Sequence, residues 1–147
     1  MIYTDKTKKA IKLCFEAHAG QPDKSGLPYA HHPLHLAEQM DDEVSTVVAL
    51  LHDIVEDTDY TFDDLEQMGF GDDVIGALRL LTHAEGIPYL DYVREIANDP
   101  IATKVKLADL AHNSDLTRLD HEPAEVDLER VRKYKKATEI LLGKEVE

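Results

Sequence analysis

The chain has 147 residues, of which 43% are hydrophobic, and its formal net charge at pH 7 is −14. This length suits one compact domain with a real core, so we expect residues 1–147 to form a single domain. The negative charge excludes general nucleic-acid binding, which needs a basic face, and disfavours anionic membrane surfaces. A small anionic partner stays compatible with it, because a bound metal and a few local cations can dominate the field inside a cleft.

The sequence lacks the features of a disulfide-bonded or membrane protein. Its single cysteine, Cys14, allows neither an intramolecular disulfide nor a cysteine-based zinc site, and its apolar neighbours at helical spacing predict a buried thiol. The first residues lack the apolar run of a signal peptide, and the longest apolar stretch, residues 47–51, is far too short to span a bilayer. We therefore expect a cytoplasmic protein without a membrane segment.

The first part of the chain predicts three helices and one loop. Residues 5–18 place their apolar side chains on one stripe, as an amphipathic helix does, and Gly20 ends that helix. Residues 21–29 are rich in proline and glycine and predict a loop. A short helix follows Pro33. Residues 45–55 are apolar almost all round, which predicts a central helix covered by its neighbours.

The rest of the chain predicts only further helices. Thr61, with Asp64 three residues later, predicts a capped helix that ends before Gly69. The same periodicity predicts helices over residues 72–83, 87–97, 100–113 and 123–142. Gly143 is a suitable stop for the last one. Strand alternation is absent from the pattern, so the sequence predicts an all-α bundle of about seven or eight helices.

The central helix contains an adjacent His52-Asp53 pair, followed one turn later by two more acids, Glu56 and Asp57. Ionised carboxylates are costly in an apolar setting unless they are paired, hydrogen-bonded or bound to a metal. On a helix, His52 and Glu56 share one face, since they lie four residues apart. Asp53 and Asp57 share the adjoining face. A divalent cation is the simplest partner for this group, and a buried hydrogen-bonded pair that only rigidifies the helix is the alternative.

A second polar group lies in the helix predicted over residues 100–113. Asp109, His112 and Asn113 have the spacing of one helix face and are embedded among apolar residues. Two helices with buried polar groups suggest the facing walls of one site. A mixed histidine and carboxylate set suits manganese, iron or zinc better than calcium. The role of His112, structural or functional, stays open at this point.

Short motifs follow one another along the chain, in the order Ala17-His-Ala-Gly-Gln21, Lys24-Ser-Gly, Pro28-Tyr29, His32-Pro33, His52-Asp53, Glu56-Asp57-Thr58-Asp-Tyr-Thr61 and Lys106-Leu-Ala-Asp109 with Asn113. This ordered set resembles the HD phosphohydrolase superfamily. It resembles most closely the hydrolase domain of RelA/SpoT homologues and their small stand-alone relatives. The resemblance covers residues from about 10 to 120.

The resemblance implies an all-helical HD-domain fold that holds one manganese ion through four ligands, His32, His52, Asp53 and Asp109. It also implies that Glu56 and Asp57 position or activate the attacking water and that Asn113 contacts the nucleotide. The implied reaction is hydrolytic removal of the 3′-diphosphate from ppGpp and pppGpp, which are small anionic nucleotides. The chemistry is consistent, because a metal lowers the pKa of bound water and a nearby carboxylate can take its proton.

The predicted nucleotide contacts depart from the family pattern. The family loop usually carries an arginine before Lys-Ser-Gly, where this chain has Asp23. An acid cannot replace an arginine that stacks on a base or binds a phosphate. Lys24 is therefore the candidate for a substrate phosphate or base contact, and Arg118 is a candidate replacement for the missing arginine. The basic run 130–136 is interpreted as a solvated helix face.

Two alternatives stay open beside the alarmone hydrolase. The first is an HD phosphohydrolase for another phosphorylated nucleotide, such as a phosphorylated dinucleotide cofactor, and Asp23 is the feature that favours it. The second is a regulatory module that binds metal and nucleotide without turnover. The presence of both Glu56 and Asp57 argues against the second alternative, because a pure binder does not need them.

Overall fold

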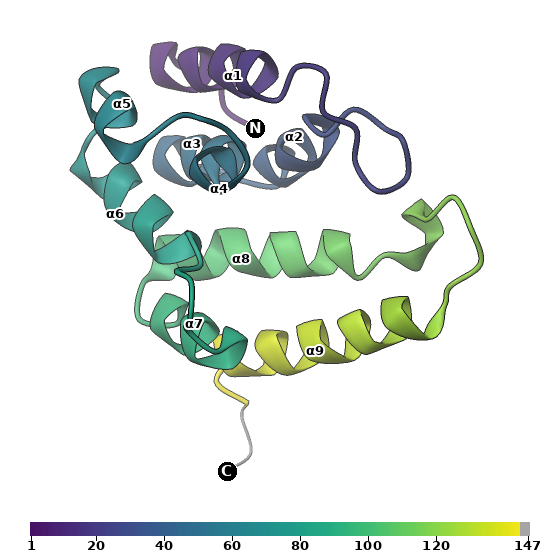
Figure 1. The fold of residues 1–147 in the computed structure, drawn as a ribbon. Helices are drawn as coiled ribbons and strands as arrows, with labels where there is room; N and C mark the ends of the chain where they lie inside the picture. Colours follow the sequence, from purple (N-terminus) through teal and green to yellow (C-terminus); the bar gives the residue numbers. More distant parts are fainter. Residues whose placement is uncertain (145–147) are drawn as a thin grey trace.

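The computed structural model describes residues 1–144, which form nine α-helices and one 3-10 helix (Figure 1). Their bounds are α1 Asp5–Ala17, α2 His31–Glu38, α3 Glu43–Leu51, α4 Ile54–Asp57, α5 Phe62–Gln67, α6 Asp72–Leu81, α7 Tyr89–Ile96, α8 Pro100–Asn113, η1 Leu116–Arg118 and α9 Glu125–Leu141. The prediction of an all-α bundle is confirmed. Every segment predicted to be helical is helical, and only the third is divided, into α3 and α4.

Helix α3 lies at the centre of the bundle. Its residues from 45 to 51 are all buried, and the helix packs against α1, α2, α6 and α8. Helix α8 in turn lies between α3 and α9, so that the chain forms successive helical layers (Figure 1). This confirms the prediction of a central helix that is covered on all sides, which follows from its lack of a polar face.

The sequence predicted that the central helix continues through the His-Asp pair. In the structure it does not. It ends at Leu51, and helical structure resumes at Ile54 as the short α4. The Nδ1 of His52 hydrogen-bonds the carbonyl oxygen of Ala49 at 2.7 Å. That oxygen is the one that the amide of residue 53 would use in a continuous α-helix. The side chain of His52 therefore competes for the backbone acceptor, and the helix is interrupted at the pair.

Helix α2 begins earlier than predicted. It starts at His31, so Pro33 lies inside its first turn rather than before it. Proline is tolerated there because the first amides of a helix have no intrahelical partner. This start brings His32 into the helix, facing α8. Helix α7 differs in the opposite sense, because it begins at Tyr89, with Pro88 as its N-cap, and not at residue 87 as predicted.

Other local predictions are confirmed. Thr61 and Asp64 form a reciprocal capping box at the start of α5. Gly143 follows α9 with a φ of 72°, a conformation that glycine adopts without strain. Cys14 is buried. Within residues 1–144, no helix is both long enough and apolar enough to cross a membrane.

Candidate functional site

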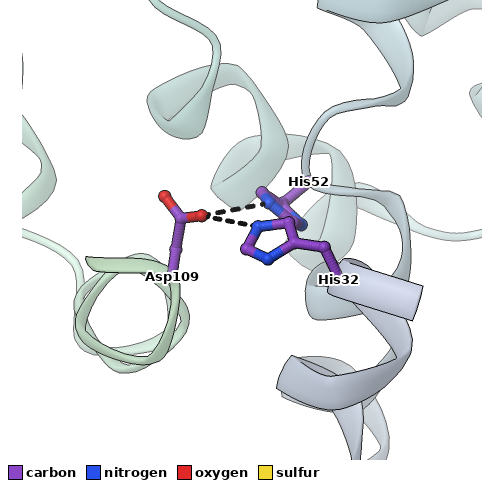
Figure 2. A group of neighbouring side chains, drawn as sticks. All are labelled: His32, His52 and Asp109. Atoms are coloured by element: carbon purple, nitrogen blue, oxygen red, sulfur yellow. Dashed lines mark hydrogen bonds and ion pairs between the residues drawn. The ribbon is translucent and has the colours of Figure 1, made fainter. Parts of the chain in front are cut away.

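Three side chains from distant parts of the chain converge between α2, the α3–α4 junction and α8 (Figure 2). They are His32, His52 and Asp109, all buried, and one potential ligand atom from each lies within 4.8 Å of the others. The Nε2 of His32 lies 2.8 Å from Asp109 Oδ1, and the Nε2 of His52 lies 3.6 Å from the same oxygen. This group can hold a metal ion, since two imidazoles and a carboxylate are ligands that first-row divalent ions accept.

The state of His52 fits such an ion. Its Nδ1 is bonded to the Ala49 carbonyl, whereas its buried Nε2 faces two carboxylate oxygens, Asp53 Oδ2 at 2.9 Å and Asp109 Oδ1 at 3.6 Å. An imidazole that is fixed by a carbonyl at one nitrogen and open at the other has the usual arrangement of a metal ligand. Nε2 thus lies among carboxylate oxygens, and a cation placed between them would be shared by the imidazole and the acids, so the residues present suit a bound cation.

Lys106 and Asn113 orient Asp109 from its own helix. The Nζ of Lys106 lies 2.8 Å from Asp109 Oδ2, and the Nδ2 of Asn113 donates to Oδ1 at 3.0 Å. Burial alone would raise the pKa of Asp109, but Lys106 and the two histidines hold it well below its usual range. Asp109 is therefore ionised, with one oxygen held by lysine and the other directed at the histidines.

The two histidines have opposite electrostatic surroundings. Burial is the largest influence on His32 and lowers its pKa. Burial also acts to lower the pKa of His52, but the carboxylates of Asp53 and Asp109 outweigh it and raise this pKa well above the usual value. Without a bound cation, the carboxylates therefore favour a proton on His52 over one on His32.

Asp53 lies beside this group without belonging to it. Its Oδ2 is 2.9 Å from His52 Nε2 and accepts a short hydrogen bond from the Tyr29 hydroxyl. The three atoms that lie within 4.8 Å of one another come from His32, His52 and Asp109, and not from Asp53. Its role as a fourth ligand stays a prediction.

A pocket of about 320 Å³ opens next to His32, between the loop of residues 21–29, the end of α8, η1 and α9. Lys24 and Asn113, the two predicted substrate contacts, both line it. Arg118 and Arg130 add two more cations to its wall. Asp23 and Asp115 also line the pocket, so three cations face two acids, and in a chain with a net charge of −14 this local excess of positive charge suits an anionic ligand.

Sequence comparison relates the chain to proteins named as GTP pyrophosphokinases and (p)ppGpp synthase/hydrolases. It is 36% identical over 153 residues to a GTP pyrophosphokinase of Streptomyces antibioticus, covering 91% of this chain and 16% of that protein. It is 31% identical over 123 residues to the bifunctional (p)ppGpp synthase/hydrolase SpoT of Escherichia coli K12, covering 74% of this chain and 17% of SpoT. The chain thus spans about a sixth of the length of these curated relatives. No protein-family profile matches it.

A solved structure has the same fold. It is a metazoan ortholog of SpoT, described as hydrolysing ppGpp, and it superposes with a TM-score of 0.78 over 99% of this chain and 90% of its own, at 25% sequence identity. The chain is a homologue of the SpoT/RelA-type (p)ppGpp enzymes.

In this SpoT/RelA homologue, the two predicted catalytic acids follow the His-Asp pair on α4. Glu56 and Asp57 are both accessible to solvent, and the backbone N–H of His83 donates to Glu56 Oε1. Partial burial raises the pKa of both carboxyls, and the negative charge of Asp53 raises them further. A carboxylate with a raised pKa is a better proton acceptor. The structure places them next to the site, and their catalytic role stays a prediction.

The sequence analysis missed two pocket residues of this SpoT/RelA homologue. It assigned the basic run 130–136 to a solvated face, and most of that run is indeed exposed. However, Arg130 and Tyr134 line the pocket. Their spacing of four residues places them on one face of α9, but only the packing of α9 on α8 shows that this face borders the pocket.

The Asp23 that departs from the family pattern has defined partners. Its Oδ1 accepts the backbone N–H groups of Ser25 at 2.8 Å and Leu27 at 2.9 Å, so it shapes the loop. Its Oδ2 lies 3.7 Å from Arg118 Nη2, across the pocket wall. The candidate replacement arginine, Arg118, therefore does line the pocket, and it stands opposite an acid.

Proposed function

We propose that the chain is a metal-dependent HD-type phosphohydrolase that removes the 3′-diphosphate from (p)ppGpp-like nucleotides, and that residues 1–147 form one such domain. The observation that carries this proposal is the convergence of His32, His52 and Asp109 next to a pocket that His32 lines together with Lys24, Arg118 and Arg130. The relatives include both pyrophosphokinases and pyrophosphohydrolases. The hydrolytic direction is favoured by a group suited to a single metal ion with carboxylates close by, and by the solved SpoT ortholog described as hydrolysing ppGpp.

The proposal assigns a role to each predicted residue of the metal site. Four ligands, His32, His52, Asp53 and Asp109, would hold a manganese ion. When bound, this ion supplies Lewis-acid chemistry and lowers the pKa of water. Glu56 and Asp57 orient the attacking water and accept its proton, for which their raised pKa values suit them.

The pocket residues have the chemistry to bind the nucleotide. Lys24, Arg118 and Arg130 can neutralise phosphate charge, and Asn113 links the pocket to Asp109 through its amide. The Nε of Arg118 is buried and has no hydrogen-bond partner within residues 1–144. An unpaired buried donor is costly, so a ligand acceptor at this position would remove that cost.

The test is turnover by the purified protein. With manganese, it should release pyrophosphate from ppGpp, and a chelator or the substitution His52→Leu should abolish the release. Folded protein that binds manganese but leaves ppGpp and related nucleotides intact would refute hydrolysis and favour the regulatory module.

Asp23 favours a second candidate, hydrolysis of another phosphorylated nucleotide. This side chain places a carboxylate, paired with Arg118, in the wall where family members have an arginine. A panel of ppGpp, a phosphorylated dinucleotide cofactor and simple nucleoside phosphates would separate the two candidates. If kcat/KM for one of the other nucleotides is at least tenfold above that for ppGpp, then that nucleotide, and not the alarmone, is the substrate.

A further inference from the structure

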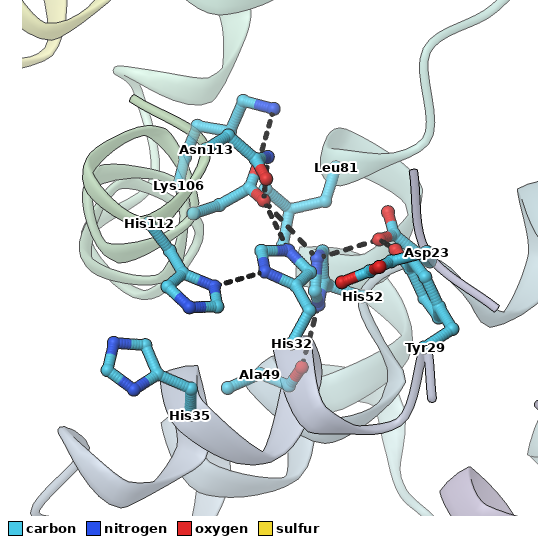
Figure 3. Close-up of polar contacts among 12 residues, drawn as sticks. Asp23, Tyr29, His32, His35, Ala49, His52, Leu81, Lys106, His112 and Asn113 are labelled. Carbon is cyan, nitrogen blue, oxygen red and sulfur yellow. Dashed lines mark hydrogen bonds and ion pairs between the residues drawn. The ribbon is translucent and has the colours of Figure 1, made fainter. Parts of the chain in front are cut away.

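His112, whose role the sequence left open, contacts a predicted metal ligand directly (Figure 3). It lies one turn after Asp109 on α8 and is buried. Its Nδ1 is 2.7 Å from the Nδ1 of His32. The planes of the two rings are inclined by only 4°, and their centroids lie 4.9 Å apart. The nitrogen–nitrogen distance is too short for one ring to lie above the other, so the two rings are nearly coplanar. The rings therefore meet edge to edge, through one hydrogen bond.

This hydrogen bond determines which nitrogen of His32 is free. The other nitrogen, Nε2, faces Asp109 Oδ1 at 2.8 Å. To bind a metal, Nε2 must present its lone pair, so the proton of the neutral ring must lie on Nδ1. That proton then needs an acceptor, and His112 Nδ1 is in place for it. His112 must therefore carry its own proton on Nε2.

The two histidines of the site are thus held by different means. His52 is bonded to a backbone carbonyl, that of Ala49, which substitutions leave in place. Metal-binding histidines usually donate their second N–H to a carboxylate, a backbone carbonyl or water. His32 instead depends on a side chain, and a single substitution can remove its acceptor.

His112 is itself fixed in position. The ring of His35 lies against it, with centroids 4.0 Å apart and the planes inclined by 24°. Its backbone carbonyl accepts a hydrogen bond from Arg118 Nη1 at 2.8 Å. Because Arg118 also lines the pocket, His112 connects the pocket wall to His32.

We infer that His112 is a positioning residue that holds His32 with Nε2 free for the metal. It accepts the His32 Nδ1–H and fixes the plane of the ring. This inference rests on the metal site proposed above and extends it to a residue that does not itself touch the ion. Outer hydrogen-bond partners of this kind change metal affinity by about 10- to 100-fold when they are lost.

The experiment compares manganese affinities of the full chain and its variants, measured by competition with a chelator. His112→Phe keeps a planar ring without an acceptor and should bind manganese about 10- to 100-fold more weakly than the wild type. His112→Asn restores an acceptor oxygen near the position of Nδ1, and should recover most of the affinity. His121→Leu is the control, because it removes a histidine that is bonded to Asp120 and Asp127 and leaves the contact between His32 and His112 intact, and it should stay close to the wild type.

Melting of the metal-free variants shows which of them are folded, and His112→Leu replaces His112→Phe if the larger ring does not fit. Wild-type affinity in the folded Phe or Leu variant would overturn the role of His112 and leave the proposed metal site intact. An equal loss in His112→Asn would also overturn it, because the acceptor would then not matter. A wild-type protein without manganese affinity would refute the proposed site and this inference with it.

Discussion

At the scale of single residues, Lys106 forms a buried ion pair with Asp109, a predicted metal ligand. Its side chain is 12% exposed and its ammonium lies 2.8 Å from Asp109 Oδ2. Burial acts to lower the pKa of Lys106, but Asp109 outweighs it and raises the pKa above the usual range. The pair is charged on both sides, and neither partner can be removed alone without leaving a buried charge.

Lys106→Met should therefore destabilise the metal-free protein by about 3–5 kcal/mol, because it leaves the Oδ2 of the buried Asp109 carboxylate without its charged partner. Urea unfolding without metal measures this loss. Lys104→Met is the matched control on the same helix, since Lys104 is 38% exposed and pairs with Asp41 and Asp42 at the surface. An equal loss of unfolding free energy in both variants would show that the buried pair contributes no more to stability than the surface pair.

Glu56 gives a prediction that depends on pH. Burial raises its pKa, so the folded chain binds this proton more tightly than the unfolded chain does. Ionised Glu56 therefore costs stability, and this cost grows as pH rises from the unfolded pKa through the folded one. Glu56→Gln removes the charge and keeps an oxygen for the His83 amide.

The metal-free Glu56→Gln variant should thus be at least as stable as the wild type at pH 7, with the difference vanishing in acid. Its hydrolysis rate should fall by about 100-fold or more, the usual effect of losing a general base. Urea unfolding at two pH values and turnover of ppGpp measure the two effects. A variant that is less stable at pH 7 and fully active would contradict both expectations.

At the scale of elements, two irregular segments position the site. The interruption between α3 and α4 presents His52 and Asp53 from a non-helical junction. The loop of residues 21–29 forms one side of the pocket, and it is pinned by Asp23 and by an isolated bridge between Pro22 and Pro28. Both segments owe their shape to side chains that bond to the backbone, a competition typical of polar residues at helix ends and turns.

Asp23→Ala and Asp23→Asn should separate the two roles of this loop residue. Asparagine keeps the oxygen that accepts from Ser25 and Leu27 but loses the charge opposite Arg118, whereas alanine loses both. Each lost hydrogen bond is worth about 1 kcal/mol. Hydrogen exchange at the Ser25 and Leu27 amides should therefore accelerate about fivefold or more in Asp23→Ala only. Equal exchange rates of these amides in both variants would show that other contacts hold the loop in its conformation.

At the scale of the whole molecule, α8 joins the layers of the bundle to the site. It packs against α3 on one side and α9 on the other, and it carries Lys106, Asp109, His112 and Asn113 (Figure 1). The convergent side chains come from α2, the α3–α4 junction and α8. A ligand bound there crosslinks three elements that are distant in sequence, and it binds only the folded chain.

Manganese should accordingly stabilise the whole fold. A ligand at a hundredfold excess over its Kd adds about 2.7 kcal/mol when it binds the native state alone. The melting temperature of the wild type should rise with manganese, and that of His52→Leu should not. His121→Leu is the control, because His121 is an exposed histidine bonded to Asp120 and Asp127 away from the site. A rise in His52→Leu equal to that of the control would refute the ligand assignment.

The sequence by itself determined the helices, because helix formation depends on residues within a turn or two of one another. The capping box at Thr61 and the glycine stop at Gly143 are local signals of this kind, and both were predicted correctly. It also identified His32, His52 and Asp109 as partners through a resemblance carried by ordered motifs. The convergence of these three side chains in space agrees with that hypothesis.

Only the tertiary structure decided which further side chains surround these three. The pocket position of Arg130 and Tyr134 and the bond between His32 and His112 depend on groups far apart in the chain. Periodicity defines the faces of a helix but not the neighbours of each face, and those neighbours are set by how α8 packs between α3 and α9. The sequence motifs for this reason pointed to Lys24, Asn113 and Arg118, whereas the places of Arg130 and Tyr134 in the pocket wall were set by the packing of α9 on α8.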